Sequence, residues 1–146
     1  MLNYNTEFLV NGPILPSTLF DLYNQSNNDS AGANSVFTGQ VRADSIHDQK
    51  VVAIEYSAYP EMVNTEILSI IQNAIQKYDD LKQIHILHSV GLVKTGEISI
   101  LVFVASGHRM QCFEAIQYLV NEIKAKVPIW KKEIFENNMH RWPSNH

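Results

Sequence analysis

The sequence predicts an α+β domain in which two main helices pack against a mixed, mainly antiparallel sheet. Four segments have the length and the apolar pattern of strands, namely 33–41, 51–59, 84–90 and 98–105. Two segments instead repeat apolar residues at spacings of three and four, as amphipathic helices do, namely 60–78 and 108–127. Because the two kinds of segment are interleaved along 146 residues, we expect a single domain that covers 1–146.

The first part of the chain is expected to form short elements. In order, these are a strand over 7–10, a short helix over 16–23 and a polar, turn-rich surface loop over 24–32. The strand 33–41 follows and brings Arg42 to its end. The polar segment 43–50 is then expected to be a mobile loop.

The remaining elements follow from similar patterns. Pro60 begins the longest amphipathic helix, directly after the half-buried strand 51–59. A turn-containing connection over 91–97 is expected to join the next two strands. Because 98–105 is apolar on both faces, we expect it to be a central strand or to be covered by a partner subunit. The last helix breaks at Pro128, and a final strand from Ile129 and an irregular tail are expected after it.

The composition is that of an ordinary globular chain, with 45% apolar residues, 18% charged residues and a net charge of −4. The overall field therefore does not favour nucleic acid or a membrane surface. No apolar run approaches the ~18 residues of a membrane span, and the first residues lack the pattern of a signal peptide. The one cysteine, Cys112, fits a reducing compartment, so we expect a cytoplasmic protein.

Two basic clusters flank the last predicted helix. His108 and Arg109 fall on its first turn, where free backbone N–H groups and the helix dipole favour an anion, although His108 is equally compatible with a capping role. Lysines gather at and beyond its far end, namely Lys124, Lys126, Lys131 and Lys132. Any one of these lysines in isolation is more often a solvated surface charge. Together the clusters predict a site for a small, negatively charged ligand.

Helical geometry separates two of these lysines. At about 100° per residue, Lys124 lies on the rim of the predicted apolar face that includes Phe113, whereas Lys126 lies on the opposite rim. The stem of Lys124 can thus be covered while its amine reaches a cleft. A lysine that is crowded by cations and partly desolvated has a lowered pKa, and its neutral amine can act as a base or nucleophile. We therefore predict that Lys124 and Lys131 are catalytic.

Other residues that could carry chemistry are weaker candidates. Gly39, shortly before Arg42, permits close approach of a ligand to the backbone. His85 and His88 lie three apart in a predicted strand and project from opposite faces, which does not suit a metal site. Cys112 lies within the apolar face of the last helix and is predicted to be a core residue. The sequence contains no Walker loop, dinucleotide glycine motif or Cys-x-x-Cys, so we expect neither a metal nor a nucleotide cofactor.

Several segments form an informative set between about residue 31 and residue 142. They include Phe37-Thr38-Gly39-Gln40-Val41-Arg42, Glu55-Tyr56-Ser57-Ala58-Tyr59-Pro60-Glu61-Met62, His88-Ser89-Val90-Gly91, Ser106-Gly107-His108-Arg109, Val127-Pro128-Ile129-Trp130-Lys131-Lys132-Glu133 and Arg141-Trp142. In this order and spacing they resemble the large, catalytic subunit of molybdopterin synthase. Each segment alone is weak evidence, whereas the set is highly specific.

The resemblance implies an α/β hammerhead-like fold and a homodimer at the centre of a heterotetramer. Each large subunit in that family binds a small, ubiquitin-like sulfur-carrier subunit that ends in Gly-Gly. The thiocarboxylate at the end of the carrier enters a pocket of the large subunit, and its sulfur passes to cyclic pyranopterin monophosphate. Two such transfers create the dithiolene of molybdopterin.

The resemblance also implies roles for single residues. Lys124 matches the lysine beside the end of the carrier, and Lys131 matches a second essential lysine. The anion- and pterin-binding positions correspond to Arg42, His108 and Arg109. Further substrate contacts correspond to the backbone of Gln40 and Val41 and to Lys132 and Glu133. Gln40 stands where many relatives have lysine.

Two other classes of function remain open from the sequence. One is a non-catalytic α+β module that binds an acidic peptide tail or a small anion. The other is an amine-dependent lyase or hydrolase that uses a lysine of low pKa. Turnover of a pterin precursor by lysine variants distinguishes these two classes from a sulfurtransferase, because only a sulfurtransferase converts that precursor.

Overall fold

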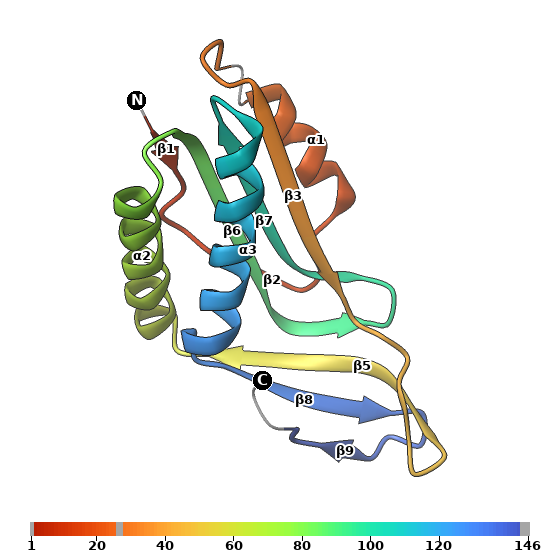
Figure 1. Cartoon of the computed structure of the whole chain (residues 1–146). Helices are drawn as coiled ribbons and strands as arrows, with labels where there is room; N and C mark the ends of the chain where they lie inside the picture. The colour runs from red at the N-terminus through yellow and green to blue at the C-terminus, as the bar shows by residue number, and fades with distance from the viewer. Residues whose placement is uncertain (1, 26–27, 144–146) are drawn as a thin grey trace.

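The computed structural model describes residues 2–25 and 28–143 (Figure 1). Within them the helices are Pro16–Gln25 (α1), Pro60–Lys77 (α2) and Arg109–Lys126 (α3). The strands are Asn3–Tyr4 (β1), Leu9–Asn11 (β2), Ala33–Gln40 (β3), Ser45–Ile46 (β4), Gln49–Ala58 (β5), Leu81–Lys94 (β6), Ile98–Ser106 (β7), Ile129–Phe135 (β8) and His140–Arg141 (β9). Positions 26 and 27 of the predicted surface loop and 144–146 of the predicted tail lie outside the described residues.

The long strand β6 connects two halves of the sheet. Its first part pairs antiparallel with β7, whose other edge pairs with β3, whereas its last residues pair antiparallel with β5. The partner changes at Gly91, whose φ of 86° is a left-handed conformation that glycine adopts readily. Strands β5, β8 and β9 therefore cross beneath the first half of the sheet (Figure 1).

The predicted fold class is confirmed. The short strands β1 and β2 run parallel to β6, and the other pairings among the described strands are antiparallel, so the sheet is mixed and mainly antiparallel. Helices α2 and α3 lie side by side on one face of the first half of the sheet (Figure 1).

Three local predictions are wrong. The segment 91–97 is not only a connection, because β6 bends at Gly91 and continues to Lys94. The segment 43–50 contains a hairpin, in which β4 pairs with β5 across His47 and Asp48, both of positive φ. The tail after β8 is not wholly irregular, since β9 pairs with β8. In each case a turn with left-handed residues or a pairing to a distant strand replaced the expected loop.

The main core lies between the sheet and the helices α2 and α3. Helix α2 contributes one row of apolar side chains, namely Val63, Ile67, Ile70, Ile71 and Ala74, and α3 contributes Cys112, Ala115, Leu119 and Ile123. Burial of such side chains stabilises a fold by about 1.5–3 kcal/mol each. Cys112 is buried, as predicted.

Strand β7 is central, as the apolar residues on both of its faces predict. Its even-numbered residues Ile100, Val102 and Val104 face the main core, and its odd-numbered residues Leu101, Phe103 and Ala105 face a second core. Leu22 of α1 covers that second core, so the strand has an apolar layer on each side.

The buried face of α3 is rotated from the predicted one. Phe113 was expected on the apolar face, but it is 60% exposed. The helix instead buries the side that contains Cys112, Ala115 and Leu119, because that side faces both α2 and the sheet. No helix among the described residues is both long enough and apolar enough to cross a membrane.

Candidate active site

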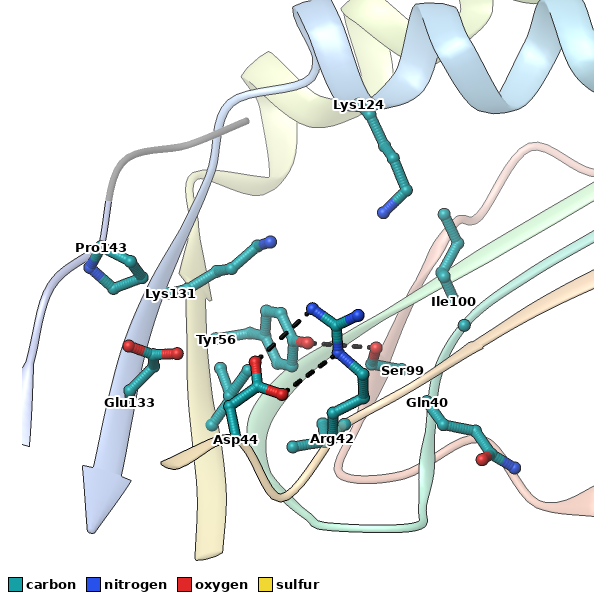
Figure 2. A pocket seen from close by; sticks show the side chains of 13 residues that line it. Gln40, Arg42, Asp44, Tyr56, Ser99, Ile100, Lys124, Lys131, Glu133 and Pro143 are labelled. Carbon is teal, nitrogen blue, oxygen red and sulfur yellow. Dashed lines mark hydrogen bonds and ion pairs between the residues drawn. The ribbon is translucent and has the colours of Figure 1, made fainter. Parts of the chain in front are cut away.

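A hollow of about 510 Å³ lies where the end of α3 faces β5, β8 and the segment after β3 (Figure 2). Six of the predicted site residues line it, namely Gln40, Val41, Arg42, Lys124, Lys131 and Glu133. They come from two distant parts of the sequence, 40–42 and 124–133. The structure therefore brings together most of the residues that the sequence singles out.

Lys124 of α3 and Lys131 of β8 direct their amines into the same space from two different walls (Figure 2). Lys124 lies in the last turn of α3, and Pro128 ends the helix so that the chain returns as β8. There Lys131 pairs in register with Tyr56 of β5, which also lines the hollow. Burial, and secondarily the charge of Lys131, lower the pKa of Lys124 below its ordinary value. A lowered pKa makes the neutral, nucleophilic amine more accessible.

Arg42 stands on the wall formed by the segment after β3. Its side chain is 83% exposed, and its Nε and Nη2 atoms lie 3.4 and 3.5 Å from the two carboxylate oxygens of Asp44. These long contacts leave the guanidinium available to an anion. The backbone before it is fixed, because the N–H of buried Val41 donates to the carbonyl of Glu97 at 3.1 Å. The side chain of Gln40 points away from the lysines (Figure 2).

Gly39 has a packing role at this site. A Cβ atom at Gly39 would lie 2.5 Å from Cγ2 of Ile100, a side chain that lines the hollow. The close approach predicted at this glycine is therefore an approach by β7 of the same chain. Any larger residue would displace Ile100 from the wall.

Strand β8 sends alternate residues to opposite sides, so Glu133 joins Lys131 in the hollow while Lys132 does not. Glu133 is buried, and one of its oxygens lies 2.9 and 2.7 Å from Nε and Nη2 of Arg141. Lys132 pairs with Glu55 at 2.9 Å, and its amine lies 5.8 Å from the ring centre of Trp142.

His108 and Arg109 do not join this hollow within one chain. They lie at the opposite end of α3, whose 18 residues span about 27 Å. The carboxylate of Asp80 already accepts the backbone N–H of His108 at 2.7 Å and lies 3.0 Å from its Nδ1. A side chain of the protein itself thus already accepts from the backbone of His108 at the helix start. The hydrogen bond from the His108 ring is the main reason that the pKa of Asp80 is lowered.

A second hollow, of about 280 Å³, adjoins the first. It shares Ile100, Lys124 and Lys131 with the first hollow. Its other walls include His88 of β6, Asn121 and Ile123 of α3, and Val127 and Ile129 at the start of β8. The two lysine amines therefore stand at a junction between two spaces.

Sequence reasoning missed several residues of this junction. Tyr56 donates a hydrogen bond to Ser99 at 3.1 Å between β5 and the start of β7, and both residues line the first hollow. His88 was considered only as a metal ligand. The prediction that His88 and His85 lie on opposite faces of the strand is correct. The same alternation puts His88 on the face of Ile84 and Ile86, which pack in the main core, so it could have shown that His88 lies on the helix side of β6. Across 2–25 and 28–143 no cluster of three or more potential metal ligands occurs.

Comparison with known proteins agrees with this architecture. The profile of the MoaE protein family matches residues 11–126. The molybdopterin synthase catalytic subunit of Thermoplasma volcanium is 41% identical over 122 residues, which cover 84% of this chain and 88% of that protein.

Solved structures agree as well. The crystal structure of molybdopterin synthase from Staphylococcus aureus superposes with a TM-score of 0.84 at 31% identity, covering 96% of this chain and 98% of that one. A complex of subunits 1 and 2 of the Helicobacter pylori molybdopterin-converting factor shares the fold, with a TM-score of 0.79 at 20% identity, covering 94% of this chain and 89% of that one. The chain therefore belongs to the MoaE family, the family of the molybdopterin synthase catalytic subunits.

Proposed function

We propose that this chain is the catalytic subunit of a molybdopterin synthase. It transfers sulfur from the thiocarboxylated Gly-Gly end of a small carrier subunit to cyclic pyranopterin monophosphate, and two transfers form the dithiolene of molybdopterin. Membership of the MoaE family supports the reaction class. The arrangement of the two lysines supports the assignment of the reaction to one place in the molecule.

The observation that carries the proposal is that Lys124 and Lys131 line both of two adjoining hollows. The larger hollow also contains Arg42, whose exposed guanidinium suits the cyclic phosphate of the substrate. The smaller hollow has apolar walls from Ile123, Val127 and Ile129 and suits an extended Gly-Gly tail. A sulfur donor and its acceptor would meet between the two amines.

The two lysines supply the charges that the transfer needs. The thiocarboxylate sulfur first bonds to the pterin substrate, which leaves a thioester. Water then attacks the acyl carbon, and a nearby ammonium stabilises the negative charge that develops on the acyl oxygen. The acyl–sulfur bond breaks, so the sulfur stays on the pterin and the carrier leaves with a C-terminal carboxylate. A neutral amine can accept the proton that is released or attack the acyl carbon. Because the pKa of Lys124 is lowered, we assign the neutral role to Lys124 and the electrostatic role to Lys131.

Assembly explains how the residues at the start of α3 could take part. The Helicobacter pylori complex contains two different subunits of the converting factor, so we propose that this chain also binds a small carrier subunit. We propose in addition a homodimer in which His108 and Arg109 of one copy bind substrate at the hollow of the other copy. The His108 side chain is 90% exposed, so it can meet a second chain while its Nδ1 stays beside Asp80. We place this assembly in the cytoplasm, where the buried free thiol of Cys112 stays reduced.

Conversion of the pterin precursor by purified variants tests the proposal. With thiocarboxylated carrier, Lys124→Ala and Lys131→Ala should each lose about 100-fold or more of the rate, because each removes a group that acts on the reacting atoms. Lys126→Ala serves as the matched control, since Lys126 pairs with Glu122 at 2.7 Å outside both hollows. Near-normal turnover in both active-site variants would refute the assignment.

A further inference from the structure

We propose that His88 is a positioning residue of the reaction centre, whose neutral imidazole accepts a hydrogen bond at Nε2 from the amine of Lys124. This inference rests on the proposed function, because it gives His88 a part in the same reaction. Neither the family resemblance nor the charge pattern of the sequence assigns His88 a role.

His88 lies on the face of β6 that points toward α3, and it forms part of the wall of the smaller hollow with Lys124 and Lys131. Its backbone is held in place, since its N–H donates to the carbonyl of Phe8 at 2.7 Å. The imidazole thus shares the wall of the smaller hollow with both lysines and with Asn121.

The main chain also determines which ring nitrogen of His88 carries the proton. Nδ1 lies 2.8 Å from the backbone carbonyl oxygen of Ser89. A carbonyl oxygen can only accept, so Nδ1 carries the proton and donates it. In the neutral ring the other nitrogen, Nε2, then has a free lone pair and acts as an acceptor. The tautomer is fixed by the main chain.

The His88 ring also stays neutral at physiological pH. Burial, and then the positive charges of Lys124 and Lys131, lower the pKa of His88 to about 4, although the hydrogen bond to Ser89 acts in the opposite direction. At physiological pH the ring therefore adds an acceptor, and not a third positive charge, to the space beside the lysines. The groups that face the ring or line its hollow are Tyr56 of β5, the Ser89 carbonyl of β6, Asn121 and Lys124 of α3, and Lys131 of β8.

The orientation of the His88 ring is also fixed by a neighbouring aromatic ring. The Tyr56 and His88 rings pack edge to face with centres 5.1 Å apart, and the Tyr56 hydroxyl is itself bonded to Ser99. An amine that donates one N–H to a fixed acceptor directs its own lone pair away from that acceptor. His88 lines only the smaller hollow, whereas Lys124 lines both, so an amine held toward His88 leaves its lone pair for the larger hollow, where the substrate would lie. The His88 ring in the smaller hollow thereby orients the Lys124 amine toward a substrate in the larger hollow.

Three variants test this role in the intact protein with its carrier. His88→Leu removes the acceptor, His88→Gln places an amide oxygen near the former Nε2, and His85→Leu is the control on the opposite face of the same strand. We expect His88→Leu to lower kcat about 10- to 100-fold with little change in KM, and His88→Gln to recover most of the loss. His85→Leu should keep the wild-type kcat. Equal losses in the Leu and Gln variants of His88 would show a packing role only and overturn the proposal.

A second measurement does not depend on turnover. Reductive methylation of Lys124, followed by mass spectrometry over a range of pH, reports the pKa of its amine. An acceptor favours the ammonium form, so His88→Leu should move the midpoint of labelling to lower pH and His88→Gln should restore it. An unchanged midpoint would overturn the proposal. If wild-type protein makes no product but the midpoint moves as expected, the proposed function fails while the contact of His88 with Lys124 stands.

Spectroscopy of the wild-type protein decides the matter if His88→Leu does not fold. Nitrogen-15 spectra of the histidine rings should show His88 as the Nδ1–H tautomer at neutral pH. A protonated Nε2 or a cationic ring would contradict the proposal, because neither can accept a hydrogen bond from the amine.

Discussion

The two ends of helix α3 carry similar charges in different surroundings. At its last turn, Lys124 faces Lys131 across two adjoining hollows whose walls come from several strands. At its first turn, His108 and Arg109 lie outside both hollows, and the carboxylate of Asp80 meets the backbone and ring of His108. Figure 1 shows these ends far apart, with only the last turn beside β5 and β8.

The difference shows what turns a basic cluster into a site. The start of the helix has the stronger intrinsic attraction for an anion, but a carboxylate of the same chain already uses it. Within the described residues, neither Lys124 nor Lys131 pairs with a carboxylate. Free positive charge with walls around it is therefore found at the end of the helix.

The largest expected effect tests whether the two ends meet between copies of the chain. Lys131→Ala and Arg109→Ala chains with different tags should each be nearly inactive alone, by about 100-fold. A mixed dimer purified through both tags has one intact site of two and should recover about half of the wild-type rate. The measurement is molybdopterin formation with thiocarboxylated carrier. A mixed dimer as inactive as its parents would show that Arg109 does not act across the dimer.

Arg42→Ala tests whether the larger hollow at the end of α3 is the one that binds the substrate. Loss of the guanidinium should raise the KM for the pterin substrate by about 10- to 100-fold, because a charge-assisted contact to the phosphate is removed. The melting temperature should hardly change, since the Arg42 side chain is largely exposed. Calorimetry with the carrier subunit should show unchanged binding. A larger loss of carrier affinity than of substrate affinity would move Arg42 out of the substrate site.

Asp44→Asn should have a smaller effect of opposite sign. Asp44 holds the Arg42 guanidinium at 3.4 and 3.5 Å and competes with a bound anion for it. Its removal should lower the substrate KM by about two- to threefold, as expected for an exposed ion pair. Steady-state kinetics at low ionic strength measure this change. An increased KM would indicate that Asp44 instead orients Arg42 for binding.

The smallest effect concerns the start of α3 and appears as a pH dependence of stability. The His108 hydrogen bond lowers the pKa of Asp80 in the folded chain, although burial raises it. The charged carboxylate therefore stabilises the fold above its unfolded pKa of about 4, and this contribution is lost as the pH falls through the folded pKa. Asp80→Asn should melt lower than wild type near neutral pH, and the two proteins should converge in acid. Parallel melting profiles across this range would contradict the assignment.

Local pattern predicted much of the fold. Residues 98–105 read as a buried strand because both of its faces are apolar, and β7 indeed has a core on each side. Pro128 predicted the end of α3, since it cannot continue a helix. The exposure of Phe113 was not predictable, because α3 carries apolar residues around much of its circumference and only its neighbours choose which side is buried.

For the site too, part could be predicted from the sequence and part depended on the tertiary structure. The sequence by itself determined which residues carry charge and which segments are strands and helices, because propensity and periodicity act over a few neighbouring residues. The sequence analysis counted Lys132 with Glu133 as a substrate contact, whereas alternation along β8 leaves Lys132 out of the hollow that Lys131 and Glu133 line.

Only the tertiary structure decided which of those charges share a space. The bend of β6 at Gly91 brings β5 and β8 beneath the last turn of α3, and this places Lys124, Lys131 and Arg42 around one hollow. The same fold puts Asp80 against His108 at the other end of the helix. Such meetings depend on pairings between residues far apart in the chain, which no local pattern of side chains can specify.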